Sequence, residues 1–119
     1  MTDRDLLEKA AKAAGIEIHW HTNGTSWAPA ADCGDFSVEY EGMHAWNPLT
    51  DDGDALRLAV KLNMDIGFDT LPDGAIAWAA LPWSDQWDEG CRVMEWLHKD
   101  PCAATRRAIV RAAAAMSEQ

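Results

Sequence analysis

The chain has 119 residues, of which 48% are hydrophobic, and its 20 acidic and 10 basic side chains give a formal net charge of −10. This length and apolar content predict a single folded domain over residues 1–119. The charge disfavours direct binding to nucleic acid and to anionic membranes, since both depend on Lys and Arg.

The first predicted helix covers residues 3–14, where leucine and alanine recur at helical spacing. Thr2 is expected to cap this helix, with Asp5 completing a capping box. Gly15 follows at the position where a left-handed residue commonly ends a helix. The sequence therefore indicates both ends of this helix.

Alternating apolar and polar residues predict strands over residues 16–21 and 36–41. Residues 22–35 between them form either a loop or a ragged strand extension through Ser26-Trp27. His19 and His21 share the polar face of the first strand, which would also suit zinc. A zinc site needs further ligands, and the sequence has none at zinc-ligand spacing. We therefore expect no metal site.

A second helix is predicted over residues 51–62, capped by Thr50 or Asp51. The acids Asp51, Asp52 and Asp54 at its start are similar to a cation-binding loop but lack the ligand spacing of calcium loops. We interpret them as complementing the free N–H groups and the positive end of the helix.

Strands are then predicted over residues 65–70, 75–81 and 92–97. The turn Leu71-Pro72-Asp73-Gly74 joins the first two, because Pro fixes φ and Gly accepts positive φ. The strand over residues 75–81 is apolar on both faces, which predicts a central position in its sheet.

The last predicted helix covers residues 101–116, with Asp100 as N-cap and Pro101 in its first turn. The element order is thus α-β-β-α-β-β-β-α. It predicts an α+β fold: a single α/β/α-type sandwich in which one mainly antiparallel or mixed sheet is covered by helices.

The sequence contains no catalytic or cofactor-binding motif. The serines do not form a nucleophile elbow, and there is no glycine-rich phosphate loop. Cys102 has His98 nearby in sequence, but no pattern positions that histidine as its base. We therefore expect no catalytic residue and no cofactor, and a chain that is not an enzyme.

Seven tryptophans are the most unusual compositional feature. Trp20 and Trp78 fall on apolar strand faces and are expected in the core. Other tryptophans lie in the acidic segment 82–90, which either folds over the sheet edge or binds a partner through an aromatic anchor. That partner-binding site would consist of Trp83, Trp87, Asp85, Asp88 and Glu89.

Acidic residues concentrate in two stretches without Lys or Arg, residues 32–54 and 65–89, which together hold 13 of the 20 acids. The last helix instead carries Arg106, Arg107 and Arg111. This asymmetry is typical of a solvated surface, and it also suits an electronegative binding face.

Two segments, Trp46–Leu62 and Ala103–Ala113, resemble stretches of small proteins from phages and bacterial prophages, the group called the phage ABA-sandwich domain. Residues 6–15 are also similar. The chain departs from this group at Asn63, often glycine there, and at Cys102, often aromatic. The resemblance implies helices on either side of a sheet and no assigned activity, and it does not extend to the segment 82–90.

No stretch approaches the roughly 20 apolar residues of a membrane span, and the N-terminus lacks the apolar core of an export signal. The three cysteines, Cys33, Cys91 and Cys102, show no disulfide-framework spacing, which favours reduced thiols. With the resemblance, these features predict a protein of the bacterial host cytoplasm.

We therefore expect a non-catalytic phage or prophage accessory protein that binds a host or phage protein, without direct contact to nucleic acid or membrane. Self-association is left open by the sequence. The alternative is an acidic, DNA-mimic-like inhibitor of a host nucleic-acid-binding defence system. That inhibitor would need carboxylates arranged like phosphates on one face, and its binding would depend steeply on salt.

Overall fold

The computed structural model describes residues 2–29, 43–80, 92–97 and 99–117, and the structural statements below concern these residues. In chain order they form α1 (Asp3–Ala14), β1 (His19–Trp20), β2 (Ser26–Pro29), β3 (Met43–Ala45), α3 (Asp52–Lys61), β4 (Asp65–Leu71), β5 (Gly74–Ala80), β6 (Arg92–Trp96) and α4 (Pro101–Met116). The predicted α+β class with antiparallel strand pairing is confirmed.

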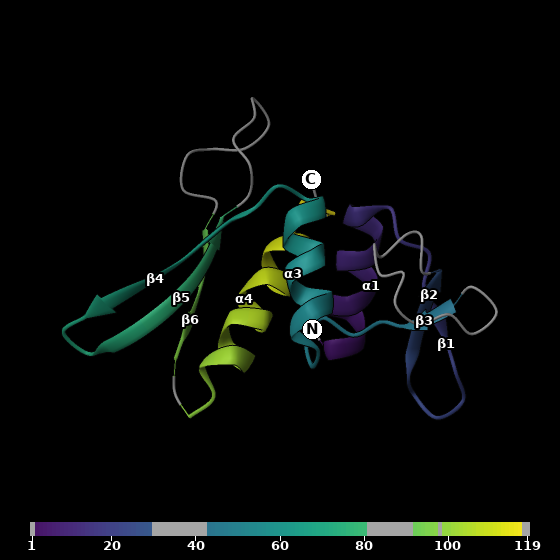
Figure 1. Ribbon diagram of the computed structural model, residues 1–119, viewed down its shortest axis with the longest axis horizontal. Coiled ribbons are helices and arrows are strands. Elements are labelled where there is room, and N and C mark those ends of the chain that lie inside the picture. The colour runs from purple at the N-terminus through teal and green to yellow at the C-terminus, as the bar shows by residue number, and fades with distance from the viewer. Residues whose placement is uncertain (1, 30–42, 81–91, 98, 118–119) are drawn as a thin grey trace.

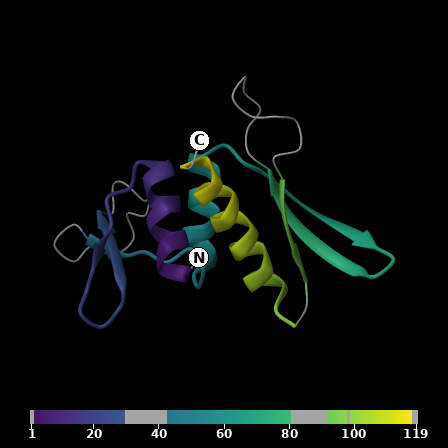
Figure 2. The same cartoon turned by 180° about the vertical axis from the view of Figure 1, so that it is seen from behind.

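The helices lie together between two antiparallel sheets (Figure 1). One sheet has the order β1-β2-β3, and the other has the order β4-β5-β6. Figure 2 shows the same arrangement from behind, with the longer sheet beside α4 and the shorter one beside α1. The strands thus form two sheets where one was expected. In each sheet, strands that follow one another in the chain are paired. The alternation of apolar and polar residues within one strand does not indicate which other strand it pairs with.

The shorter sheet differs from its prediction in extent. Within the segment 16–21, β1 comprises only His19 and Trp20, and the chain then turns back with a hydrogen bond from His21 N to Thr25 O of 2.9 Å. Of the two alternatives for residues 22–35, the extension through Ser26-Trp27 agrees with the structure: these two residues begin β2, which pairs with β1 and β3. The strand predicted over residues 36–41 lies outside the described residues.

Helix boundaries follow their capping residues. Thr2 and Asp5 form the predicted capping box on α1, and Gly15 ends that helix with a φ of 70°. Asp51 caps α3, and the carboxylate of Asp100 caps α4 by accepting from Ala103 N at 3.0 Å. These interactions are local in sequence, which explains why all three helices were predicted within about two residues of their ends.

The core is centred on α4, which packs against α1, α3, β5 and β6. Its buried face is rich in alanine, so neighbouring helices can approach it closely. β5 is the central strand of its sheet, as predicted. The largest fully buried side chain is Trp46, whose carbonyl accepts a hydrogen bond from Ser26 Oγ. Of the two tryptophans expected in the core, Trp20 is half-buried and packs against it, whereas Trp78 is half-buried and does not belong to this cluster.

No helix among the described residues combines the length and apolar character needed to cross a membrane.

Candidate functional site

An apolar groove lies between α3, β4 and α4 and has a volume of about 410 Å³. Two large hydrophobic side chains on it are unusually exposed, Leu56 at 59% and Phe68 at 62%. Buried side chains of Ala55 and Ile109 complete the apolar surface. The full lining is Asp52, Ala55, Leu56, Ile66, Phe68, Pro101, Cys102, Thr105, Arg106 and Ile109.

The position of Phe68 follows from strand register. Phe68 pairs with Ala77 on β5, and the two side chains therefore share the sheet face turned toward α4. Ala77 is fully buried, and β5 is a principal contact of α4. Phe68 lies one strand farther out, where α4 no longer covers the sheet. Its ring therefore lines a groove instead of the core.

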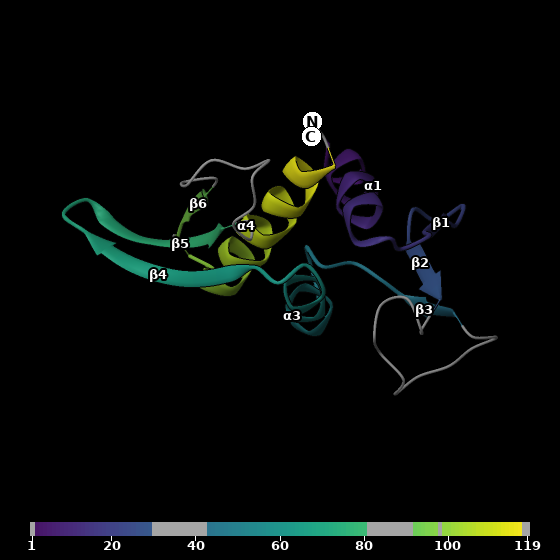
Figure 3. The same ribbon diagram turned by 90° about the horizontal axis from the view of Figure 1, so that it is seen from above.

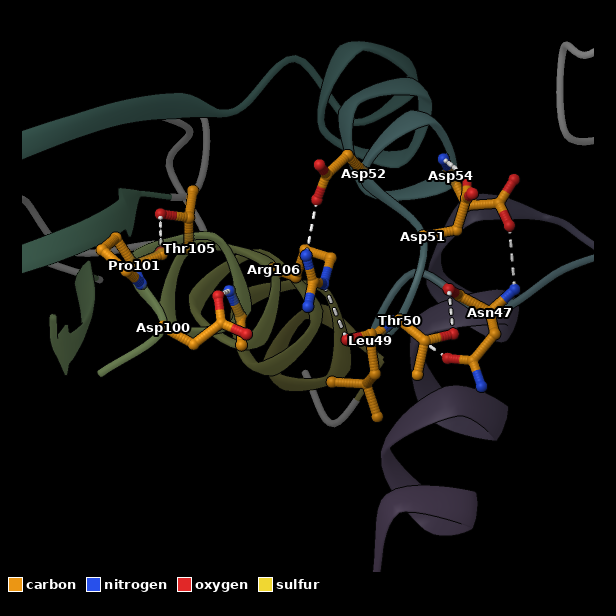
Figure 4. Close-up of polar contacts among 11 residues, drawn as sticks. Asn47, Leu49, Thr50, Asp51, Asp52, Asp54, Asp100, Pro101, Thr105 and Arg106 are labelled. Atoms are coloured by element: carbon orange, nitrogen blue, oxygen red, sulfur yellow. Dashed lines mark hydrogen bonds and ion pairs between the residues drawn. The ribbon is translucent and has the colours of Figure 1, made fainter. Parts of the chain in front are cut away.

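Arg106 fixes one end of this groove by joining α4 to α3 (Figure 4). Its guanidinium donates at 2.6 Å to Asp52 Oδ1, and its Nε donates at 2.8 Å to the Leu49 carbonyl. The Arg106 side chain is only 15% exposed, whereas its partner Asp52 is 72% exposed. Arg106 thus links α4 both to α3 and to the segment that precedes α3.

Asp54 anchors the chain that leads into α3. It is almost fully buried and accepts from Asn47 N at 2.9 Å and from Arg57 Nη2 at 2.8 Å. Asp51 accepts from Asp54 N at 2.8 Å as the helix N-cap (Figure 4). The interpretation of this acidic segment as a helix start is thus confirmed.

Among the described residues, His19 and His21 do not belong to a ligand cluster. His21 lies against the ring of Trp27, with centroids 5.1 Å apart, and His19 lies 3.7 Å from Glu17 Oε1. Within the ranges that the structure covers, no three His, Cys, Asp or Glu side chains are close enough together to hold a metal ion. Cys102 is exposed at the start of α4 and lines the groove.

The predicted aromatic site cannot be placed in this arrangement, because Trp83, Asp85, Trp87, Asp88 and Glu89 all lie outside the described residues. It stays a prediction. Sequence reasoning missed the groove itself. Its signal was the width of the apolar stripe on residues 51–62, which includes Leu56 and exceeds what one buried helix face needs.

Charge is divided unevenly between the described and undescribed parts of the chain. Eight of the 20 acids and no Lys or Arg belong to the undescribed residues, leaving 12 acids beside all 10 bases. Several of these 12 acids form ion pairs: Asp3 with Arg107, Glu8 with Arg4, Asp52 with Arg106, Asp54 with Arg57, and Glu95 with Arg111. The described surface is therefore closer to charge balance than the whole chain.

No protein-family model matches the chain, and no curated protein or solved structure is significantly similar to it. The resemblance to the phage ABA-sandwich group thus rests on the sequence segments named above.

Proposed function

We propose that this protein is a non-catalytic accessory protein of phage or prophage origin that acts by binding a basic partner protein. The resemblance of Trp46–Leu62 and Ala103–Ala113 to phage proteins supports the origin. The observation that carries the binding role is the groove between α3, β4 and α4, beside which Leu56 and Phe68 are more than half exposed. An apolar side chain of the partner enters this groove.

Burial of apolar surface supplies the affinity in this proposal. Covering exposed hydrocarbon contributes about 25 cal/mol per Å² removed from water. Contiguous exposed apolar patches on soluble proteins commonly mark interaction sites. Because Arg106 already ties α4 to Asp52 on α3, the groove needs little reorganisation when a partner binds. Less of the free energy gained by burial is then offset by the entropy cost of ordering the groove.

Electrostatics determines the character of the partner. The net charge of −10 repels acidic surfaces and attracts basic ones, which raises the rate of encounter at low salt. A partner with an exposed apolar side chain flanked by Lys or Arg fits both the apolar groove and the net negative charge of the protein. Affinity from the anchor should survive high salt, whereas the electrostatic contribution should not.

The test is affinity capture from host lysate at low and high salt, followed by binding measurements with the purified captured protein. Wild type is compared with Leu56→Ser/Phe68→Ser and with Val60→Ser as the matched control. Val60 is 71% exposed on the same helix but does not line the groove. We expect salt-resistant binding by wild type and by the Val60 variant, and at least tenfold weaker binding by the double variant.

Three other results would count against the groove. A partner that binds all three proteins equally and is lost only in Trp83→Ala/Trp87→Ala would place the interaction in the segment 82–90. A nucleic-acid-binding partner that is lost at high salt and is indifferent to every apolar variant would support the DNA-mimic alternative. Recovery of no specific partner at either salt would contradict protein binding altogether.

A further inference from the structure

The second feature of this region is the open edge of β4. In the sheet order β4-β5-β6, β4 pairs only with β5 among the described residues. Residues 65 and 68–71 of this seven-residue strand are exposed. Figure 3 shows β4 as the outermost strand, with its hairpin extending past α4. Alternate backbone N–H and C=O groups of such a strand point away from its neighbour and can accept another strand.

β4 lacks most of the devices that normally block such an edge. Natural edge strands carry proline, lysine or a bulge, or are very short. β4 contains neither proline nor lysine, and its register with β5 runs without interruption from Asp65↔Ala80 to Leu71↔Gly74. The strand is therefore long, regular and geometrically ready for pairing.

Carboxylates decide which strand can pair there. Asp65 and Asp69 lie on the sheet face opposite Phe68 and are exposed, and neither forms an ion pair with another described residue. A second copy of the chain paired antiparallel about Phe68 would bring the two Asp69 side chains onto the same face, and each copy carries a net charge of −10. Like charges close together across strands are destabilising, whereas opposite charges are favourable. The edge therefore disfavours self-pairing and favours a basic strand.

The two faces of β4 define the pattern of that strand. Ile66 and Phe68 lie on the face toward the groove, while Asp65 and Asp69 lie on the other face. Side chains of an added strand alternate between the same two faces. Every second residue would thus be apolar and enter the groove, and the residues between them would be basic and lie beside the carboxylates.

We propose that the partner binds as an extended segment of alternating basic and apolar residues, which adds to the outer edge of β4, unpaired among the described residues, and places its apolar side chains in the groove. This inference rests on the proposed function and specifies its geometry. Strand addition gives affinity through main-chain hydrogen bonds and specificity through alternate side chains.

The direct test uses synthetic peptides and the full-length protein. The probe is a nine-residue peptide of alternating Lys and Val. One control has the same composition with Lys and Val in separate blocks, and a second has N-methyl groups on the amides of alternate residues that would face β4. We expect the alternating peptide to bind at least tenfold more tightly than either control by calorimetry. We also expect it to slow hydrogen exchange of β4 amides.

Two protein variants with the same change in net charge test whether the charge on β4 itself affects binding. Asp69→Lys should weaken binding of the alternating peptide at least tenfold. Asp73→Lys makes the same charge change in the adjoining turn, off the strand, and should weaken it less than threefold. Both side chains are exposed, so neither variant is expected to unfold the protein.

The outcomes distinguish this inference from the proposed function. Equal binding of the N-methylated and unmodified peptides would overturn strand addition, and so would equal binding of the blocked peptide. If the alternating peptide fails to bind while a captured partner still requires Leu56 and Phe68, strand addition fails and the groove stands. If Leu56→Ser/Phe68→Ser weakens binding of neither the alternating peptide nor the captured partner, the groove is not the binding site.

Discussion

The indole of Trp78 lies directly over Gly67 on the neighbouring strand: a Cβ atom built at Gly67 would be only 2.2 Å from Trp78 Cζ2. The two residues are register partners on β5 and β4. The guanidinium carbon of Arg92 lies 4.2 Å from the centroid of the same ring, which adds a cation–π contact. Glycine at position 67 is therefore required by the width of the indole and not by backbone conformation.

Replacement of Gly67 should destabilise the protein for this reason. We expect Gly67→Ala to lower the free energy of unfolding by about 1–3 kcal/mol, the usual range for overpacking. Urea denaturation followed by circular dichroism measures this directly. In a Trp78→Ala background the same substitution should cost less than about 1 kcal/mol. An equal cost in both backgrounds would show that the indole is not the cause.

The buried carboxylate of Asp54 should contribute more to the stability of the fold than the exposed carboxylate of Asp52. Asp54→Ala removes the acceptor for Asn47 N and for the Arg57 guanidinium, and breaking such a buried charged interaction costs about 3 kcal/mol. Asp52→Ala on the same helix removes a 72% exposed carboxylate and should cost at most about 1 kcal/mol. Chemical denaturation of both variants gives the comparison, and similar losses would contradict the structural role assigned to Asp54.

The residues that line the groove should differ in how much they contribute to the free energy of unfolding. Ile109 is 3% exposed and belongs to the core, so Ile109→Ala should cost about 2–4 kcal/mol. Phe68→Ala removes a ring that is already mostly in water and should change stability by less than about 1 kcal/mol. Thermal unfolding of both variants tests this, and a large loss in the Phe68 variant would show that its ring is part of the core.

The capping box on α1 predicts a measurable titration shift. Hydrogen bonds from the Thr2 backbone N–H and then its side chain hold the pKa of Asp5 below its ordinary value of 3.8. The stabilisation by this carboxylate is therefore complete above pH 3.8 and is lost as the pH falls through the lower, folded-state pKa. A carbon-detected NMR titration of the Asp5 carboxyl group measures the shift.

A matched variant assigns the cause of that shift. Thr2→Ala removes the side-chain hydrogen bond and retains the backbone one, so the pKa of Asp5 should rise part of the way toward its ordinary value. An unchanged pKa in this variant would show that the Thr2 hydroxyl contributes nothing.

Sequence signals predicted the structure where the interactions are local. Thr2, Asp5 and Gly15 define α1, Asp100 and Pro101 define the start of α4, and the turn before Gly74 defines the β4–β5 hairpin. In each case the deciding atoms lie within a few residues of one another. The α+β class and the central position of β5 followed from the same signals.

Tertiary contacts explain what the sequence did not reveal. Trp46 is almost fully buried, and its carbonyl accepts a hydrogen bond from Ser26, which lies 20 residues earlier. No local pattern encodes that contact. The groove likewise depends on where α4 stops covering the sheet, which leaves Phe68 exposed and Ala77 buried. An alternating strand pattern cannot distinguish these two positions.

The central place of α4 has a consequence for biosynthesis. This helix is the last described element to emerge from the ribosome, yet it contacts the first, as in the ion pair of 3.2 Å between Arg107 and Asp3. Until Pro101–Met116 has been translated, the apolar faces of α1 and α3 have no central helix to cover them. The domain must therefore assemble after this helix is synthesised, and a message cut short before the codon for Pro101 would yield a product that cannot complete its core.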